Sequence, residues 1–239
     1  MPLPKISTPT YELELPSTGE TIQYRPFLVR EEKLLVLALE SENMKEITTA
    51  IKTVIKSCIL SKGIKIESLP TFDIEYLFLN IRGKSVGEEI EVNVICPDDE
   101  DITVPVTISV DEIQVVKNEK HTNKIKVDDS IMMEMKYPSL DQFIKSNFDF
   151  SGANLMDQSF DLVASCVDKI YSGDEVWTSA DVTKKEIMEF LEQMNSSQFK
   201  QIETFFETMP KLSHTVKVKN PKSGVESEVV LEGLSNFFA

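Results

Sequence analysis

The sequence is short of the residues that mark several protein classes. It has 239 residues, of which only 3 are cysteine and 8 are glycine. The cysteines at positions 58, 96 and 166 are an odd and widely spaced set. Such a set makes no disulfide framework and indicates synthesis in a reducing compartment. With 41% hydrophobic residues and few glycines, the chain is expected to fold around a packed core.

Basic residues are also scarce. The chain has 25 Lys and Arg against 40 Asp and Glu, a formal charge of −15. An excess of negative charge repels phosphate backbones, so we predict no direct binding of nucleic acid. No apolar run approaches the ~18 residues that span a bilayer. The first residues also lack the basic region and apolar core of a secretory signal. The sequence therefore predicts a soluble protein without a membrane span.

The usual catalytic signatures are missing. There is no Gly-rich phosphate loop, no G-x-S-x-G nucleophile elbow and no H-E-x-x-H pair. His121 and His214 lie far apart in the sequence, and neither falls in a nucleophile motif. We predict a protein that is not an enzyme and uses no cofactor. A metal-dependent or nucleotide-dependent enzyme of unrecognised fold is the alternative from another functional class.

A repeated pattern is what the sequence does contain. Residues 74–98 and 202–222 both read as a helix followed by a hairpin. The aligned pairs are Ile74 with Ile202, Phe78 with Phe206, Val92 with Val216, Val94 with Val218, Cys96-Pro97 with Asn220-Pro221 and, upstream, Cys58 with Cys166. A period of roughly 100 residues is longer than the ~20 to 50 residues of a solenoid repeat. It indicates a duplicated module.

Hydrophobic periodicity predicts the elements of both copies. Helices are expected at residues 29–39, 44–58, 72–81, 155–170, 184–194 and 198–209, with another opening at Pro138 before a loop at 147–153. Hairpins are expected at residues 11–25, 89–108 and 215–231, and short strands at 113–116, 125–127 and 131–137. Pro105 implies that its strand lies at a sheet edge.

These elements predict an α+β fold. It consists of two related helical modules, each ending in a β-hairpin, with an N-terminal β-hairpin and a central β segment. The expected divisions are an N-terminal module at residues 1–112, a polar connecting segment at 113–130 and a C-terminal module at 131–239, the probable duplicate of the first.

The two hairpin tips were compared with metal sites. Residues 95–101, ICPDDED, resemble half of a zinc knuckle, whereas the second tip has Asn220 and Ser223 where thiols would be. Zinc prefers four N or S ligands and only Cys96 remains, so we predict no metal. The acidic tip lacks the spacing of an EF-hand. We expect a solvated acidic turn, in which replacing Asp98 to Asp101 by serine leaves folding intact.

Candidate partner contacts lie on a proline-rich N-terminal arm, the two tips, one tryptophan and the C-terminal aromatics. They are Leu3, Tyr11, Cys96, Pro97, Asp98, Asp99, Trp177, Asn220, Pro221, Phe237 and Phe238. Extended arms and edge hairpins can join a partner's surface, and Trp is enriched at interface hot spots. Burial of Trp177 in its own domain is an equal alternative. The C-terminal aromatics are also expected to dock into a core, so that their removal destabilises the fold.

The chain resembles the baseplate proteins of contractile-tailed bacteriophages, especially the hub-associated proteins of T-even-like phages. Three segments carry the likeness: PLPKISTPTYELELPSTGETIQYRPFLVREEKLLVLALES, IMMEMKYPSLDQFIKSN and FFETMPKLSHTVKVKNPKSGVESEVVLEGLSNFF. The likeness covers essentially the whole chain and consists of apolar, Tyr/Pro and hairpin positions.

The resemblance implies a nonenzymatic structural or assembly subunit of the tail baseplate or its central hub. Its partners would be other baseplate or hub proteins, and the chain could itself form an oligomer. It would be present in the host cytoplasm during assembly and then in the virion tail baseplate. The alternative is a transient assembly chaperone of the hub or tail tube that is absent from the mature virion.

Overall fold

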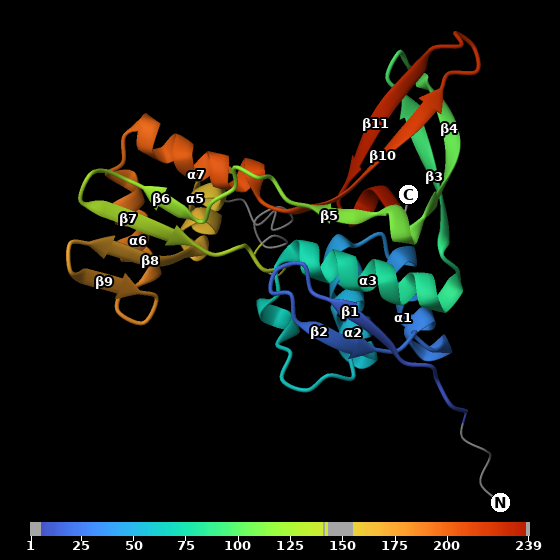
Figure 1. Ribbon diagram of the computed structural model, residues 1–239, viewed down its shortest axis with the longest axis horizontal. Helices are drawn as coiled ribbons and strands as arrows, with labels where there is room; N and C mark the ends of the chain where they lie inside the picture. The colour runs from blue at the N-terminus through green and yellow to red at the C-terminus, as the bar shows by residue number, and fades with distance from the viewer. Residues whose placement is uncertain (1–5, 141, 143–154, 238–239) are drawn as a thin grey trace, which may run out of the picture. The chain divides into compact units, whose positions relative to one another are not determined.

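The chain forms two compact units (Figure 1). The computed structural model describes residues 6–140, 142 and 155–237. Unit 1 comprises Met1–Ile66, Phe72–Val116 and Lys211–Ala239, and unit 2 comprises Glu67–Thr71 and Lys117–Pro210. Helices accompany several small antiparallel sheets, which confirms the predicted α+β class.

Unit 1 begins with the predicted N-terminal hairpin, β1 (Tyr11–Glu14) and β2 (Thr21–Tyr24). Three helices follow: α1 (Val29–Glu40), α2 (Met44–Cys58) and α3 (Thr71–Val86), with a 3-10 turn, η1 (Ile66–Ser68), before α3. The α3 segment is apolar on most sides because much of it is buried. Gly83 allows α3 to approach Val110 closely, because a Cβ at this position would lie 3.3 Å from both methyl carbons of Val110.

Two further hairpins complete unit 1. The first consists of β3 (Glu89–Cys96) and β4 (Asp99–Ser109), which form a two-stranded sheet, so β4 with Pro105 is an edge strand as predicted. The second consists of β10 (Lys211–Lys219) and β11 (Glu226–Glu232), extended by β5 (Gln114–Val116) in the order β11-β10-β5. Short 3-10 turns follow each hairpin, η2 (Val110–Glu112) and η3 (Leu234–Phe237).

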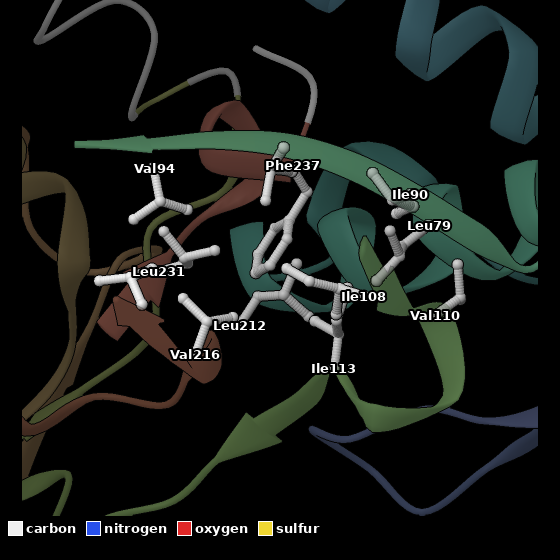
Figure 2. Packing of buried hydrophobic residues seen from close by; sticks show 12 residues of the cluster. Leu79, Ile90, Val94, Ile108, Val110, Ile113, Leu212, Val216, Leu231 and Phe237 are labelled. Atoms are coloured by element: carbon white, nitrogen blue, oxygen red, sulfur yellow. The ribbon is translucent and has the colours of Figure 1, made fainter. Parts of the chain in front are cut away.

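The two hairpins share one hydrophobic core. Strict alternation turns every second side chain of β3 and β10 inward, because successive side chains of a strand point to opposite faces. The buried cluster consists of Leu79, Ile90, Val92, Val94, Ile108, Val110, Ile113, Leu212, Val216, Val218, Leu231 and Phe237. Figure 2 shows the Phe237 ring in the middle of the labelled side chains. The predicted docking of this C-terminal aromatic into a core is confirmed.

In the part of unit 2 that the structure describes, three helices share a core with a four-stranded sheet. The sheet has the order β6-β7-β8-β9, with β6 (Lys124–Lys126), β7 (Ile131–Met135), β8 (Val167–Ser172) and β9 (Glu175–Thr178). The helices are α5 (Leu155–Cys166), α6 (Lys184–Glu192) and α7 (Ser196–Thr208). Their core includes Ile125, Met133, Met135, Val163, Cys166, Val167, Ile187, Leu191, Ile202 and Phe205. Thr183 caps α6 in a capping box with Glu186, as its sequence predicts.

One element prediction is wrong in unit 2. The helix expected at residues 155–170 ends at Cys166, and Val167–Ser172 is the strand β8 between β7 and β9. Over so short a stretch the apolar spacing fits either a helix or a strand. Pairing with β7 and β9 makes the segment a strand. Asn195 caps α7, since its side-chain oxygen accepts from the Ser197 and Gln198 N–H groups. The helix predicted to open at Pro138 and the loop at 147–153 lie largely outside the described residues.

The unit boundaries differ from the predicted module boundaries. The polar connecting segment is divided, because β5 pairs with β10 in unit 1 and β6 pairs with β7 in unit 2. Lys211–Ala239, predicted as the end of the C-terminal module, belongs to unit 1. The duplication itself stays a prediction.

A similar backbone hydrogen bond is found at the aligned residues Cys58 and Cys166. In unit 1 the Arg25 N–H donates to the Cys58 carbonyl at the end of α2, at 3.0 Å. In unit 2 the Lys136 N–H donates to the Cys166 carbonyl at the end of α5, at 2.7 Å. In each unit a strand end is therefore joined to a helix C-terminus, whose last carbonyls have no partner within the helix.

Replacing Phe237 by alanine tests the shared core. Because its ring is fully buried among both hairpins, Phe237→Ala should lower the free energy of unfolding by about 3 to 5 kcal/mol. Val230→Ala is the control, since Val230 is exposed on β11 and should change stability by less than about 0.5 kcal/mol. Urea denaturation of both variants measures the difference. Equal stabilities would contradict the position of Phe237 in the core.

Candidate protein-interaction site

The thiols of this chain are buried and protonated. Cys58, Cys96 and Cys166 are free cysteines and all are buried. Burial raises the pKa of Cys58 to about 11 and that of Cys166 to about 12. A thiol with so high a pKa is a poor nucleophile at neutral pH, because the thiolate is the reactive form. Within the described residues, no three or more His, Cys, Asp or Glu side chains are grouped to hold a metal ion.

The histidines have structural roles in separate units. In unit 2, His121 lies between Thr208 Oγ1 at 2.9 Å from Nδ1 and the Tyr137 hydroxyl at 3.0 Å from Nε2. The Thr208 hydroxyl donates to the Thr204 carbonyl, so Thr208 Oγ1 accepts from His121 and the proton is on Nδ1. Burial lowers the pKa of His121, which favours this neutral form. In unit 1, His214 Nδ1 faces the Glu112 carbonyl at 3.1 Å.

The tips of the two hairpins of unit 1 are joined by hydrogen bonds. Asp98 Oδ2 accepts from Asn220 Nδ2 at 3.0 Å and from the Ser223 hydroxyl at 2.6 Å. Asn220 is only 1% exposed, and its Oδ1 accepts from the Lys222 N–H at 2.8 Å, which closes its own turn. The hydrogen bonds from Ser223 and Asn220 lower the pKa of Asp98. Asp98 is exposed, as expected for a solvated acidic turn, but its carboxylate also joins the two tips, which the expectation did not include.

The other predicted contact residues have different environments. Cys96 is buried beneath the first tip, whereas Pro97 and Pro221 are exposed. Asp99 is half-buried and accepts from the Asp101 N–H. Tyr11 is half-buried beside Tyr24, with ring centroids 5.8 Å apart, and Trp177 is half-buried in β9. Leu3 and Phe238 lie outside the described residues. Whether any of these residues touches a partner stays a prediction.

Helix α1 carries an exposed apolar surface. Val29 is 79% exposed and Leu37 is 55% exposed. We call the exposed apolar residues of this segment the α1 face: Leu28, Val29, Leu34, Val36, Leu37 and Leu39. Ala38 and the carboxyl-bearing Glu31 are the buried residues of the helix. Contiguous exposed apolar residues on one element mark interaction sites more often than scattered ones do.

A buried ion pair fixes the start of α1. The Glu31 carboxylate accepts from Arg25 Nη2 at 3.0 Å, from Arg30 Nε at 2.7 Å and from the Leu28 N–H at 2.8 Å. Arg25 also donates to the Ser57 carbonyl at the end of α2, so one guanidinium joins the N-terminal hairpin to both helices. Burial by itself would raise the pKa of Glu31, but these hydrogen bonds outweigh it and lower the pKa to about 2.

Sequence reasoning missed the α1 face. It predicted a helix at residues 29–39 but named none of the exposed apolar residues as a candidate contact. The available signal was the run LLVLAL at residues 34–39, which is apolar around the whole helix. A helix that covers a core on one side needs a stripe of only three or four apolar residues per two turns. The surplus indicates a second apolar surface.

Asn220→Ala tests the joined tips. The substitution removes both the turn contact and the donor to Asp98, so we expect the free energy of unfolding to fall by about 1 to 3 kcal/mol. Asp101→Ala, on the exposed part of the acidic tip, should change it by less than about 0.5 kcal/mol. Urea denaturation distinguishes them. Equal effects would mean that the tips are not joined in solution.

Glu31 predicts a dependence of stability on pH. Its folded pKa of about 2 is below the usual 4.5, so its contribution is complete above pH 4.5 and is lost as the pH falls toward 2. Glu31→Gln should lower the free energy of unfolding by roughly 1 to 3 kcal/mol at pH 7. The difference from wild type should narrow between pH 4.5 and 2, as measured by denaturation at each pH. A difference that does not change with pH would contradict the ion pair.

Comparison with known proteins gives one match, which is to a family. The model of the family described as T4 bacteriophage base plate protein matches residues 8–239. No curated protein and no solved structure matches the chain.

Proposed function

The chain belongs to the family of T4 bacteriophage base plate proteins, and on this premise we propose that it is a nonenzymatic structural subunit of a contractile-tail baseplate or its central hub. Membership implies other phage baseplate proteins as partners. No helix in the described ranges is long and apolar enough to cross a membrane. In this proposal the chain assembles in the host cytoplasm and then remains in the virion tail.

The observation that carries the proposal is the α1 face. Six large apolar side chains are exposed on one segment, although the same unit has a well-packed core elsewhere. Removing apolar surface from water contributes roughly 25 cal/mol per Å², so a neighbouring subunit that covers this helix gains affinity directly. The rigid attachment of α1 through Glu31 and Arg25 supports the same role, because a preorganised surface loses little entropy on binding. We assign the α1 face to another baseplate protein with an apolar contact surface.

Further contacts are assigned to the segments singled out in the sequence. The N-terminal arm that includes Leu3 lies along a neighbouring subunit, and exposed tip residues such as Pro97 and Pro221 add contacts at the hairpins. Cys96, Asn220 and Phe237 act indirectly, since each is buried within unit 1 and shapes the surface above it. The edge strand β11 offers unpaired backbone groups to a partner.

The second candidate function is a transient assembly chaperone. The observation that favours it is the formal charge of −15, since an acidic protein can shield the interfaces of a basic client and then dissociate. Mass spectrometry of purified tails separates the two functions. A resident subunit is present in mature tails, whereas a chaperone is found only with assembly intermediates.

Substitutions on the α1 face test the proposal. Val36→Glu/Leu37→Glu should weaken association with the baseplate by at least roughly 30-fold, because truncation of interface hot spots costs about 2 kcal/mol or more. The measurement is the amount of the chain recovered in sedimented baseplates from cells infected with phage carrying the variant. Lys120→Glu, exposed in unit 2 and outside the α1 face, is the control for a charge reversal and should be recovered as wild type.

Circular dichroism of the purified variants checks that both fold, as expected for exposed positions. Normal recovery of the double variant in baseplates would contradict the assignment of the α1 face as a contact.

A further inference from the structure

The two hairpins of unit 1 have differently charged outer faces. In β10–β11, each outward lysine lies beside a glutamate of the other strand. The pairs are Lys211 with Glu232 at 3.4 Å, Lys217 with Glu228 at 3.7 Å and Lys219 with Glu226 at 3.1 Å. Opposite charges in directly opposed positions stabilise a hairpin, whereas unpaired like charges do not. The outer face of the second hairpin is therefore neutralised within the hairpin.

The outer face of β3–β4 has no such neutralisation. The directly opposed outward residues are Glu89 with Ser109, Glu91 with Thr107, Asn93 with Pro105 and Ile95 with Thr103. None of them is basic, and within the described residues Glu89 and Glu91 make no ion pair. Glu100 and Asp101 add exposed negative charge at the tip. Negative charge thus flanks an uncharged centre in which Ile95 is 56% exposed.

The difference between the two hairpins is found at corresponding positions of their strands. Each hairpin turns paired valines inward: Val92 opposes Val106, and Val216 opposes Val229. One residue from these valine pairs toward the hairpin tip, Asn93 and Pro105 of the first hairpin correspond to Lys217 and Glu228 of the second. Ile95 and Thr103 likewise occupy the places of Lys219 and Glu226. The first hairpin therefore has uncharged residues where the second has ion pairs. Apolar centres with charged rims are the usual composition of protein interfaces.

We propose that the outer face of β3–β4 docks a basic surface patch of another baseplate protein, one whose Lys or Arg side chains meet Glu89 and Glu91 around an uncharged centre. The proposal rests on the proposed function for the class of partner and adds the chemistry of a second contact surface. A second copy of this chain is a poor occupant, because the lysines of its own outer hairpin face are already paired. Pro105 disfavours strand addition along β4, so the partner packs on the face.

The test uses the full chain and the individually purified baseplate proteins of the same phage as probes. Dissociation constants are measured for wild type and for Glu89→Lys/Glu91→Lys at low and high salt. We expect one baseplate protein to bind, the double reversal to weaken its binding on the order of tenfold at low salt, and the difference to shrink at high salt. The matched control is Asp174→Lys/Glu175→Lys, at two exposed acidic residues of unit 2, which should change binding less than about twofold.

The outcomes separate this proposal from the proposed function. If a baseplate protein binds and both double variants behave alike, the docking face is wrong while the structural role stands. If binding depends on the α1 face but not on Glu89 and Glu91, the docking face is again wrong and the structural role stands. If no baseplate protein binds the wild-type chain, both proposals fail. Restoration of binding to the Glu89→Lys/Glu91→Lys variant by acidic substitutions in the partner's basic patch would identify the opposing surface directly.

Discussion

Mutual burial of two hairpins is the constraint on which unit 1 depends. An isolated two-stranded hairpin is at best marginally stable in water, because it has only one apolar face and nothing to cover it. Here β3–β4 and β10–β11, more than 100 residues apart along the chain, supply apolar faces to one cluster around Phe237. The chain must therefore return to unit 1 after forming unit 2, and the Asp98 to Asn220 bond joins the tips where it does so.

That arrangement leaves the outward faces of the two hairpins outside the shared core. Because the inward faces of the hairpins satisfy each other, their outward faces carry no folding requirement and can differ. One is neutralised by lysine and glutamate pairs, and the other is acidic with an uncharged centre. Helix α1 likewise has a part that holds the fold and a part that does not. Glu31 and Arg25 fix its buried side, while the rest of the helix exposes apolar residues. A structural subunit of an assembly needs surfaces of this kind.

Much of the local structure follows from the sequence, and the exceptions have identifiable causes. Apolar residues spaced three and four apart predicted α2 at its observed bounds, and the strict alternation of apolar and polar residues predicted β3. The strand β8 was predicted as helix because pairing with two neighbouring strands, rather than its own sequence, determines its structure. The engagement of Asp98 was missed because its partners, Asn220 and Ser223, lie over 120 residues away. The α1 face was missed because an apolar run all round a helix does not show which of its residues the fold covers.

By itself the sequence determined the α+β class, the inward faces of the hairpins and the likeness to phage baseplate proteins. These properties depend on local periodicity and composition, which each segment carries alone. Only the tertiary structure decided which hairpin covers which, which acidic residues are paired and which apolar residues stay in water. Those depend on contacts between segments distant in the chain, and no local pattern records them.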